Sequence, residues 1–318
     1  MKNDRGRVRG NAVRWGVAAT AAALPAIAYA AGAPDSAAPW WIWPLALLLV
    51  CFVLGMIAVP AGLGGGVLFV PIVSGFFPFH LDFVRGAGLL VALASALAAG
   101  PGLLRAGLSD LRLALPLALL ASAGAIVGAL VGLALPADVV QAALGVTILG
   151  IAVVMWRAKK AEYPEVTRPD SLGAALRICG VFHDAATRRD VTWQVHRTPI
   201  GMVSFAGIGV LAGMFGLGAG WANVPVLNLV MGVPLKLSAG TSTLILSVAD
   251  SAAAWIYINK GALLAIIAVP SVIGVMLGAF IGARLLRILK ASVIRRLVIV
   301  LLLLAGARAL AKGMGWWS

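Results

Sequence analysis

One carboxyl group in this chain stands where a charge is expensive. Of the 11 acidic residues, only Asp250 lies near the middle of a hydrophobic stretch. A carboxylate in that position costs on the order of 2.5–3.5 kcal/mol on membrane-insertion scales, so it needs a cavity, a partner or a proton. Two interpretations follow: Asp250 carries a proton along a substrate path, or it hydrogen-bonds a neighbouring helix and never titrates.

Hydroxyl groups surround this aspartate in the sequence. On a helix, Thr243 and Asp250 are spaced i and i+7, and Ser247 lies between them on the same face. This spacing predicts a polar stripe, with Asp250 as the proton-coupling group. The hydroxyls that we expect to donate hydrogen bonds to a ligand are those of Thr241, Ser242 and Thr243, while Ser247 and Ser251 continue the stripe.

Two glycine clusters, residues 62–66 and 216–220, are each followed by a Val-Pro pair. Glycine costs roughly 1 kcal/mol against alanine inside a helix, so each cluster predicts a break. Broken backbone at membrane depth survives where protein buries it or where it lines a cavity, and the helix end that follows suits an anion. The alternative is close helix packing through small residues. The expected binding residues are Gly62, Gly64, Gly65 and Gly66 from one cluster and Gly216, Gly218, Gly220 and Asn223 from the other.

The clusters belong to a repeat in which the second half matches the first after a shift of 154 positions. Gly55, Pro71 and Gly86 fall on Gly209, Pro225 and Gly240 without a gap. Glycine and proline mark backbone geometry, so this agreement indicates a duplicated structural unit. An internal repeat in a membrane protein is typical of a transporter with its site between the halves.

Composition sets the class of protein. Hydrophobic residues make up 62% of the 318 positions, charged residues 11%, and the mean hydropathy is +1.03, which indicates a polytopic membrane protein. The net charge of +14 comes from basic residues between hydrophobic segments and fits topology and anionic lipid better than nucleic acid. Two cysteines and three histidines form no metal-ligand pattern, and no paired nucleophile and base occurs, so we expect no metal, no cofactor and no enzyme.

Each half contains five hydrophobic stretches. The second stretch of each half is shorter than the ~20 residues that a helical span needs, which predicts a half-helix or re-entrant segment. Arg85 and Lys236 lie at segment ends, where we expect their side chains to extend to lipid headgroups. The stretches are residues 41–61, 66–79, 86–104, 113–135 and 139–156, then 199–215, 220–233, 239–258, 262–283 and 292–311.

The distribution of basic residues predicts the orientation. The linker of residues 157–198 is strongly basic, which places it in the cytoplasm. Corresponding loops of the two halves carry opposite charge bias, so the halves are expected to be inverted. Within the linker, residues 178–183 and 191–196 have strand character and predict either a β-hairpin or a solvated connector. Residues 1–40 are basic and then Ala-rich, as in a signal-like or anchor segment.

The pattern G-x-G-G-G-x-x-x-V-P at Gly62–Pro71, with its near copy at Gly216–Pro225, resembles the sulfite exporter TauE/SafE family of bacterial membrane proteins. The Gly240-Thr241-Ser242 segment is similar to the G-T-S segment of that family. The resemblance implies export of sulfur-containing anions such as sulfite or organosulfonates. The chain departs from the family at Ala219 and at Gly86-Ala87-Gly88, which shifts the expected contacts towards the second half.

We therefore expect an all-α membrane protein of two inverted-topology repeats, each of about five segments with Gly-broken helices. Its parts are residues 1–40, the first repeat 41–156, the linker 157–198 and the second repeat 199–318. The expected function is proton-linked export of a small sulfur-containing anion through the bacterial inner membrane. The alternatives are a passive anion channel and a non-transporting scaffold. The expected partners are the anion and the bilayer. Small-residue helix faces at Gly124–Ala129 and Gly278–Ala283 favour close helix packing and allow a homodimer.

Overall fold

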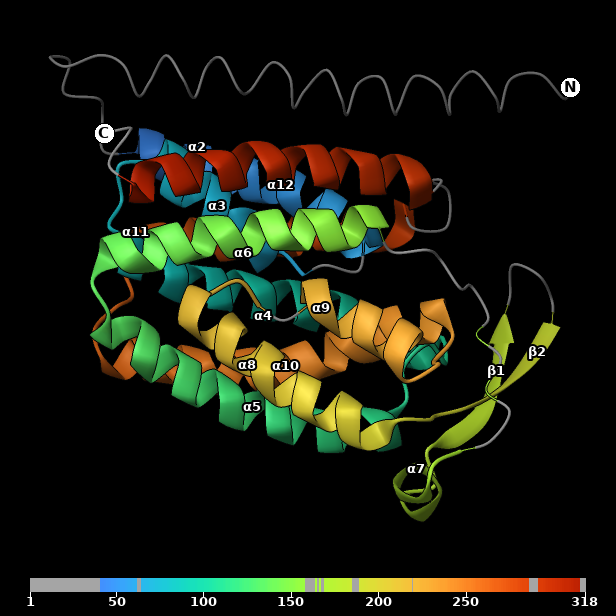
Figure 1. Cartoon of the computed structure of the whole chain (residues 1–318). Helices are drawn as coiled ribbons and strands as arrows, with labels where there is room; N and C mark the ends of the chain where they lie inside the picture. Colours follow the sequence, from blue (N-terminus) through green and yellow to red (C-terminus); the bar gives the residue numbers. More distant parts are fainter. Residues whose placement is uncertain are drawn as a thin grey trace, which may run out of the picture.

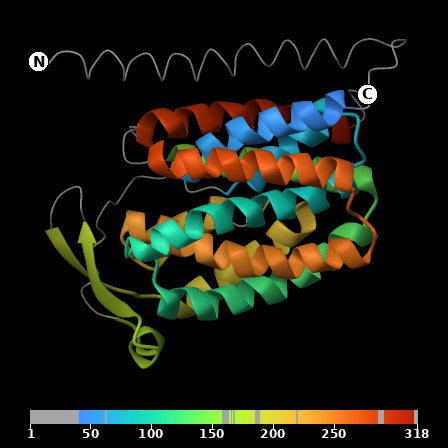
Figure 2. The same cartoon turned by 180° about the vertical axis from the view of Figure 1, so that it is seen from behind.

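The structure is a computed structural model, and it describes residues 41–61, 64–157, 164, 166, 169–184, 189–218, 220–285 and 291–314. Its helices lie side by side in one bundle, and a small β-hairpin stands at one end of it (Figures 1 and 2). Residues 1–40, for which we expected a signal-like or anchor segment, and Gly62 lie outside the described residues.

The helices follow the predicted hydrophobic stretches. Five of the described helices are long and apolar enough to cross a membrane, which agrees with an all-α membrane protein. The first half contains α2 (Ile42–Ala61), α3 (Gly66–Phe76), α4 (Leu81–Arg105), α5 (Leu111–Ala134) and α6 (Ala137–Arg157). The second half contains α8 (Thr198–Phe215), α9 (Gly220–Pro225), the π-helix η1 (Val226–Val230), α10 (Leu235–Asn259), α11 (Ala265–Leu285) and α12 (Ala291–Gly313).

Helix bounds recur at the same spacing of 154 residues. Helix α4 maps onto α10 at both ends, and α3 maps onto the continuous run of α9 and η1. Both short segments have 11 residues, enough for about 16 Å of helix and thus about half of the hydrocarbon core. Pro225 ends α9 and the π-helical turn η1 follows directly, whereas the matching Pro71 lies inside the regular helix α3.

The two halves interlock through glycine faces. Helix α2 packs on α11, and α8 packs on α5. A Cβ atom added at Gly278 would lie 2.0 Å from the Phe52 carbonyl oxygen. At the repeat-related contact, a Cβ atom added at Gly124 would lie 2.2 Å from the Ala206 carbonyl oxygen. The small-residue faces predicted at Gly124 and Gly278 are therefore buried within the chain, so they offer no surface to a second copy.

Helices α4 and α10 pack against each other in opposite directions at the centre of the bundle. Gly86, near the start of α4, lies against Ala262, just past the end of α10, with 2.3 Å between an added Cβ and the Ala262 carbonyl oxygen. Gly240, near the start of α10, lies against Leu108, just past the end of α4, with 1.9 Å for the same measure. Only glycine allows either approach.

The linker holds a short helix, α7 (Ser171–Ala175), and a two-stranded antiparallel hairpin. Strands β1 (Cys179–Asp184) and β2 (Arg189–Gln194) lie where the two strand-like runs of the linker predict them. The buried side chains of Ile178 and Trp193 join an apolar cluster with residues of α5, α8, η1 and α10. The hairpin therefore docks on the end of the bundle where α8 and α10 begin.

Candidate functional site

The two glycine clusters meet in the interior of the bundle. Gly64 and Gly218 occupy matching positions and both have left-handed backbone, with φ of +58° and +69°. A Cβ atom added at Gly66 would lie 2.6 Å from the Leu217 carbonyl oxygen. The side chain of Leu246 on α10 reaches both loops, since added Cβ atoms at Gly64 and Gly218 would contact its two methyl groups. The loops thus converge beside the middle of α10, as their repetition predicts.

The first loop is internally satisfied. The backbone N–H of Gly65 donates a 3.0 Å hydrogen bond to Oγ of Ser95 on α4. That hydroxyl in turn donates to the Ala92 carbonyl oxygen at 2.8 Å. We did not predict a role for Ser95, and the only signal in the sequence is its position as one hydroxyl in the apolar run from Val91 to Ala99.

The second loop lies against Asp250. A Cβ atom at Gly218 would lie 3.1 Å from Oδ2 of Asp250 and 2.9 Å from Cβ of Ala92 on α4. The Asp250 side chain is fully buried, and neither oxygen has a hydrogen-bond partner among the residues that the structure describes. A buried polar group without a partner is rare in folded proteins, so such a group at a helix break marks a candidate site.

Three further side chains, on α9 and α10, have buried polar atoms without described partners. These are both polar atoms of the fully buried Asn223 side chain, the indole Nε1 of Trp221 and the hydroxyl of Ser242. Gly220 is buried at the start of α9. Helix α9, which carries Asn223 and Trp221, packs on α10. Trp221 also packs against an apolar cluster that includes Leu246, one helical turn beyond Ser242. The packed pair α9 and α10 therefore contains several buried donors and acceptors that no described residue engages.

The other expected hydroxyls are committed elsewhere. Thr241 accepts a 3.1 Å hydrogen bond from the Asp110 N–H at the start of α5, at the end of α10 where the hairpin docks. The hydroxyls of Thr243, Ser247 and Ser251 donate to carbonyl oxygens of their own helix, and Ser251 is exposed. The face of α10 with unpartnered polar groups is that of Ser242 and Asp250.

Arg85 joins the ends of two helices inside the protein, and our expectation that it reaches a lipid headgroup is wrong. Its side chain is fully buried. One terminal nitrogen donates to the carbonyl oxygens of Gly132 and Met214, both at 3.0 Å, and the other pairs with Asp82. These carbonyls end α5 and α8, where a cation complements the helix dipole. The Tyr257 hydroxyl adds a 3.0 Å bond to the Gly213 carbonyl oxygen. Gly216, with φ of +68°, abuts the Arg85 backbone.

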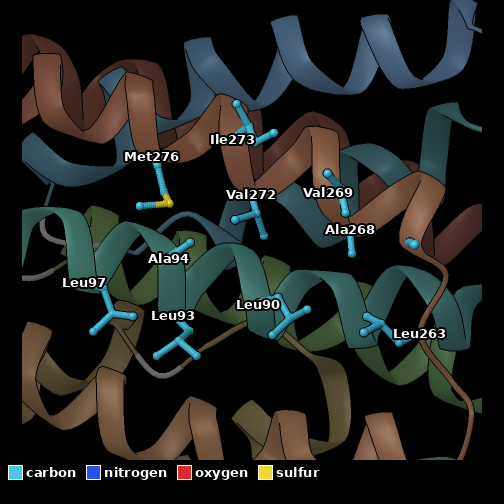
Figure 3. A pocket seen from close by; sticks show the side chains of 11 residues that line it. Leu90, Leu93, Ala94, Leu97, Leu263, Ala268, Val269, Val272, Ile273 and Met276 are labelled. Carbon is cyan, nitrogen blue, oxygen red and sulfur yellow. The ribbon is translucent and has the colours of Figure 1, made fainter.

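A groove between α4 and α11 has a volume of about 540 Å³ (Figure 3). It is lined by aliphatic side chains and Met276 and offers no charged or hydroxyl group. Leu97 and Val269 on its wall are more than half exposed. Because an anion needs donors, this groove does not fit an anion, and the polar region around Asp250 remains the candidate site. No group of three or more potential metal ligands occurs among the described residues.

Comparison with known proteins adds a family to this geometry. The family model described as "Sulfite exporter TauE/SafE" matches residues 47–309, which include both glycine loops, α4, α10 and the linker. Neither the curated proteins nor the solved structures contain a match to this chain. Since the family match covers most of the sequence, the chain belongs to the sulfite exporter TauE/SafE family of membrane transporters.

Proposed function

We propose that this protein exports a small sulfur-containing anion, sulfite or an organosulfonate, across the bacterial inner membrane, and that transport is linked to protons through Asp250. Family membership supports a sulfur-anion exporter. The observation that carries the proposal is the fully buried Asp250 carboxyl group beside the Gly218 bend, with no described partner. A neutral carboxyl group is the form that such surroundings accommodate, so the group can hold a proton at membrane depth.

Two inverted repeats would create this site at the centre of the membrane. In support, equivalent helices α4 and α10 are antiparallel, and contacts such as Gly86 with Ala262 recur as Gly240 with Leu108. These reciprocal contacts are those of a two-fold axis that lies across the helices. In a bilayer that axis would run in the membrane plane, as in transporters whose halves alternate access to a central site.

Each predicted binding residue has a proposed part in this site. Gly64, Gly65 and Gly66 form one wall, and Gly216, Gly218 and Gly220 form the other. Asn223 and Ser242 supply hydrogen bonds to substrate oxygens, and Trp221 adds its indole N–H. Thr241 and Thr243 shape the start of α10, since the Thr241 hydroxyl accepts from the Asp110 N–H and the Thr243 hydroxyl donates to the Ala239 carbonyl oxygen of its own helix.

The linker end of the bundle is proposed to face the cytoplasm. Arg105, Arg112 and Lys236 lie at the helix ends near the hairpin, and Arg177 and Arg197 lie beside the hairpin itself. Basic residues gather on the cytoplasmic side of membrane proteins, which supports this orientation.

Sulfite flux from proteoliposomes that contain the full chain tests the proposal. Wild type should release sulfite faster than empty liposomes, and the rate should change with an imposed pH gradient. The Gly218→Leu variant should abolish flux, because the side chain would occupy the space of Ala92 and the Asp250 carboxyl group. Gly207→Leu on α8 is the control, since nothing lies within 4 Å of a Cβ atom there.

The outcome separates the alternatives. Flux that ignores the pH gradient would indicate a passive anion channel. No flux of sulfite or of any organosulfonate, from protein that is folded, would contradict transport and leave a membrane scaffold.

A further inference from the structure

We infer that the site takes a sulfur oxyanion with one negative charge rather than two, together with one proton on Asp250, so that anion and proton cross the membrane in the same direction. This inference rests on the proposed function and deepens it by naming the charge class of the substrate. It follows from the kinds of polar group that surround the site.

The candidate donors on α9 and α10 are neutral. The Asn223 amide, the Ser242 hydroxyl and the Trp221 indole N–H can donate hydrogen bonds, and none of them carries a positive charge. They suit the three oxygens of a sulfonate or of hydrogen sulfite. Neutral donors in a buried site can stabilise a single spread charge, whereas a second charge needs a cation to offset its desolvation.

No described cation is placed to offset a second charge. The helices that pack on α10 contribute Asp82, Arg85 and Arg105 from α4 and Arg112 from α5, while α8, α9 and η1 have no titratable side chain; α10 itself adds Lys236 and Tyr257. Arg105, Arg112 and Lys236 lie at helix ends, Lys236 about 20 Å along the helix from Asp250.

Arg85 is the cation nearest to the site among these groups, and it is already engaged. It lies seven residues before Ala92 on α4, about 10 Å along the helix axis. Its charge is paired with Asp82, and its hydrogen bonds go to the ends of α5 and α8. Arg85 and Asp82 together are neutral, so they add little to the potential at Asp250.

The only charge that the site itself can supply is negative. If Asp250 were ionised, a bound monoanion would place two like charges within a few ångströms in a buried region, at a cost of several kcal/mol. With a proton on Asp250, the loaded site carries one negative charge, and the carboxyl O–H becomes a further donor to the anion. With a bound dianion, the site would carry two negative charges even when Asp250 holds its proton.

The direction of net movement then depends on two gradients. Anion and proton move together, so an outward anion gradient that exceeds the inward proton gradient produces export. A monoanion with one proton also moves no net charge, which makes the step insensitive to membrane potential.

Methanesulfonate and sulfate form the matched pair that tests this inference, because both are tetrahedral and of similar size but differ by one charge. Isothermal titration calorimetry of the purified full chain in detergent would measure the affinity for each between about pH 5 and pH 9. We expect methanesulfonate to bind about 100-fold or more tightly than sulfate, with an affinity that falls as the pH rises, by up to tenfold per unit. In Asp250→Asn, whose amide carries no titratable proton, methanesulfonate binding should be independent of pH, and Asp250→Glu should restore the dependence.

Equal affinities for sulfate and methanesulfonate, or a wild-type affinity that stays constant over this pH range, would overturn the inference and leave the proposed transport standing. If folded wild-type protein binds neither methanesulfonate, sulfite nor sulfate, the proposed function fails together with the inference. The wild-type comparison needs no variant, so it holds even if Asp250→Asn does not fold.

Discussion

The two glycine bends have similar backbone conformations but differ in the polar groups around them. Each bend places a left-handed glycine, Gly64 or Gly218, at the same position and leads into a helical segment of 11 residues. In the first bend, the backbone N–H of Gly65 donates a hydrogen bond to Oγ of Ser95 on α4. In the second half the positions that match these two residues are Ala219 and Ala249, so this bond has no counterpart.

Buried polar side chains without partners occur instead near the second bend. The positions of Ala96, Gly88 and Phe69 in the first half are taken by Asp250, Ser242 and Asn223 in the second. All three polar side chains are buried without described partners. The two halves thus share the left-handed glycine, while at these three positions only the second half carries buried polar groups without described partners. In the function proposed above, the first half forms a wall of the site and the second half carries its polar groups.

We expect the largest difference between the two halves at Arg85. Arg85 has Ala239 as its counterpart, so the second half has no cation at the matching position. We expect Arg85→Met to lower the free energy of unfolding by about 3 kcal/mol, because the ends of α5 and α8 lose their donor and Asp82 loses its partner. Thermal unfolding in detergent measures the effect. Asp82→Asn is the control and should cost less, since that side chain is 31% exposed; equal costs would contradict the role of Arg85 in joining the two helix ends.

The paired left-handed glycines test whether the bends are equivalent in shape but not in surroundings. Gly218→Ala should destabilise the protein by about 2 kcal/mol and slow transport, since its methyl group meets Ala92 and the Asp250 carboxyl group. Gly64→Ala should cost about 1 kcal/mol, because its nearest neighbour is the flexible end of Leu246, 3.3 Å away. Unfolding midpoints and sulfite flux should rank the variants in this order, and the reverse order would contradict the described packing.

Ser95 tests the first bend. Ser95→Ala removes the acceptor of the Gly65 N–H and should lower the free energy of unfolding by about 1 kcal/mol. The affinity for methanesulfonate should stay within about twofold of wild type, because this hydroxyl is used within the fold. A large loss of affinity with unchanged stability would place Ser95 in the site.

Ser242 tests the second bend and should show the opposite pattern. Its buried hydroxyl has no described partner, so Ser242→Ala should leave stability unchanged or raise it by up to about 1 kcal/mol. The same change should weaken methanesulfonate binding by about tenfold, the share of one hydrogen bond to an anion. If Ser242→Ala destabilises the protein without an effect on affinity, the hydroxyl has a structural part and the contrast with Ser95 fails.

Much of the fold could be predicted from the sequence, because hydropathy and glycine placement act locally. The run from Leu235 to Asn259 is apolar enough to cross a membrane, and Gly124 and Gly278 sit at the spacing of close-packed faces. The linker hairpin was one of two alternatives, since alternation over six residues is a weak signal. The burial of Trp193 against the bundle, which decides the docking of the hairpin, depends on tertiary contacts.

The site was harder to predict than the fold. Spacing placed Thr243 and Ser247 with Asp250 on one helical face, but it could not show that their hydroxyls bond to their own helix. Arg85 was misplaced for a related reason: its acceptors, Gly132 and Met214, are 47 and 129 residues away in the chain. A hydrophobic stretch with an arginine at its start has the same pattern whether the side chain turns outward or inward.

Proton coupling through Asp250 is tested most directly by sulfite flux from proteoliposomes at clamped membrane potential, with Asp250→Asn compared with wild type under an outwardly and an inwardly directed pH gradient. We expect wild-type efflux to be faster when the interior is the more acidic side, and efflux through Asp250→Asn to be the same under both gradients. A variant that keeps the wild-type response to the gradient would show that a group other than Asp250 carries the proton.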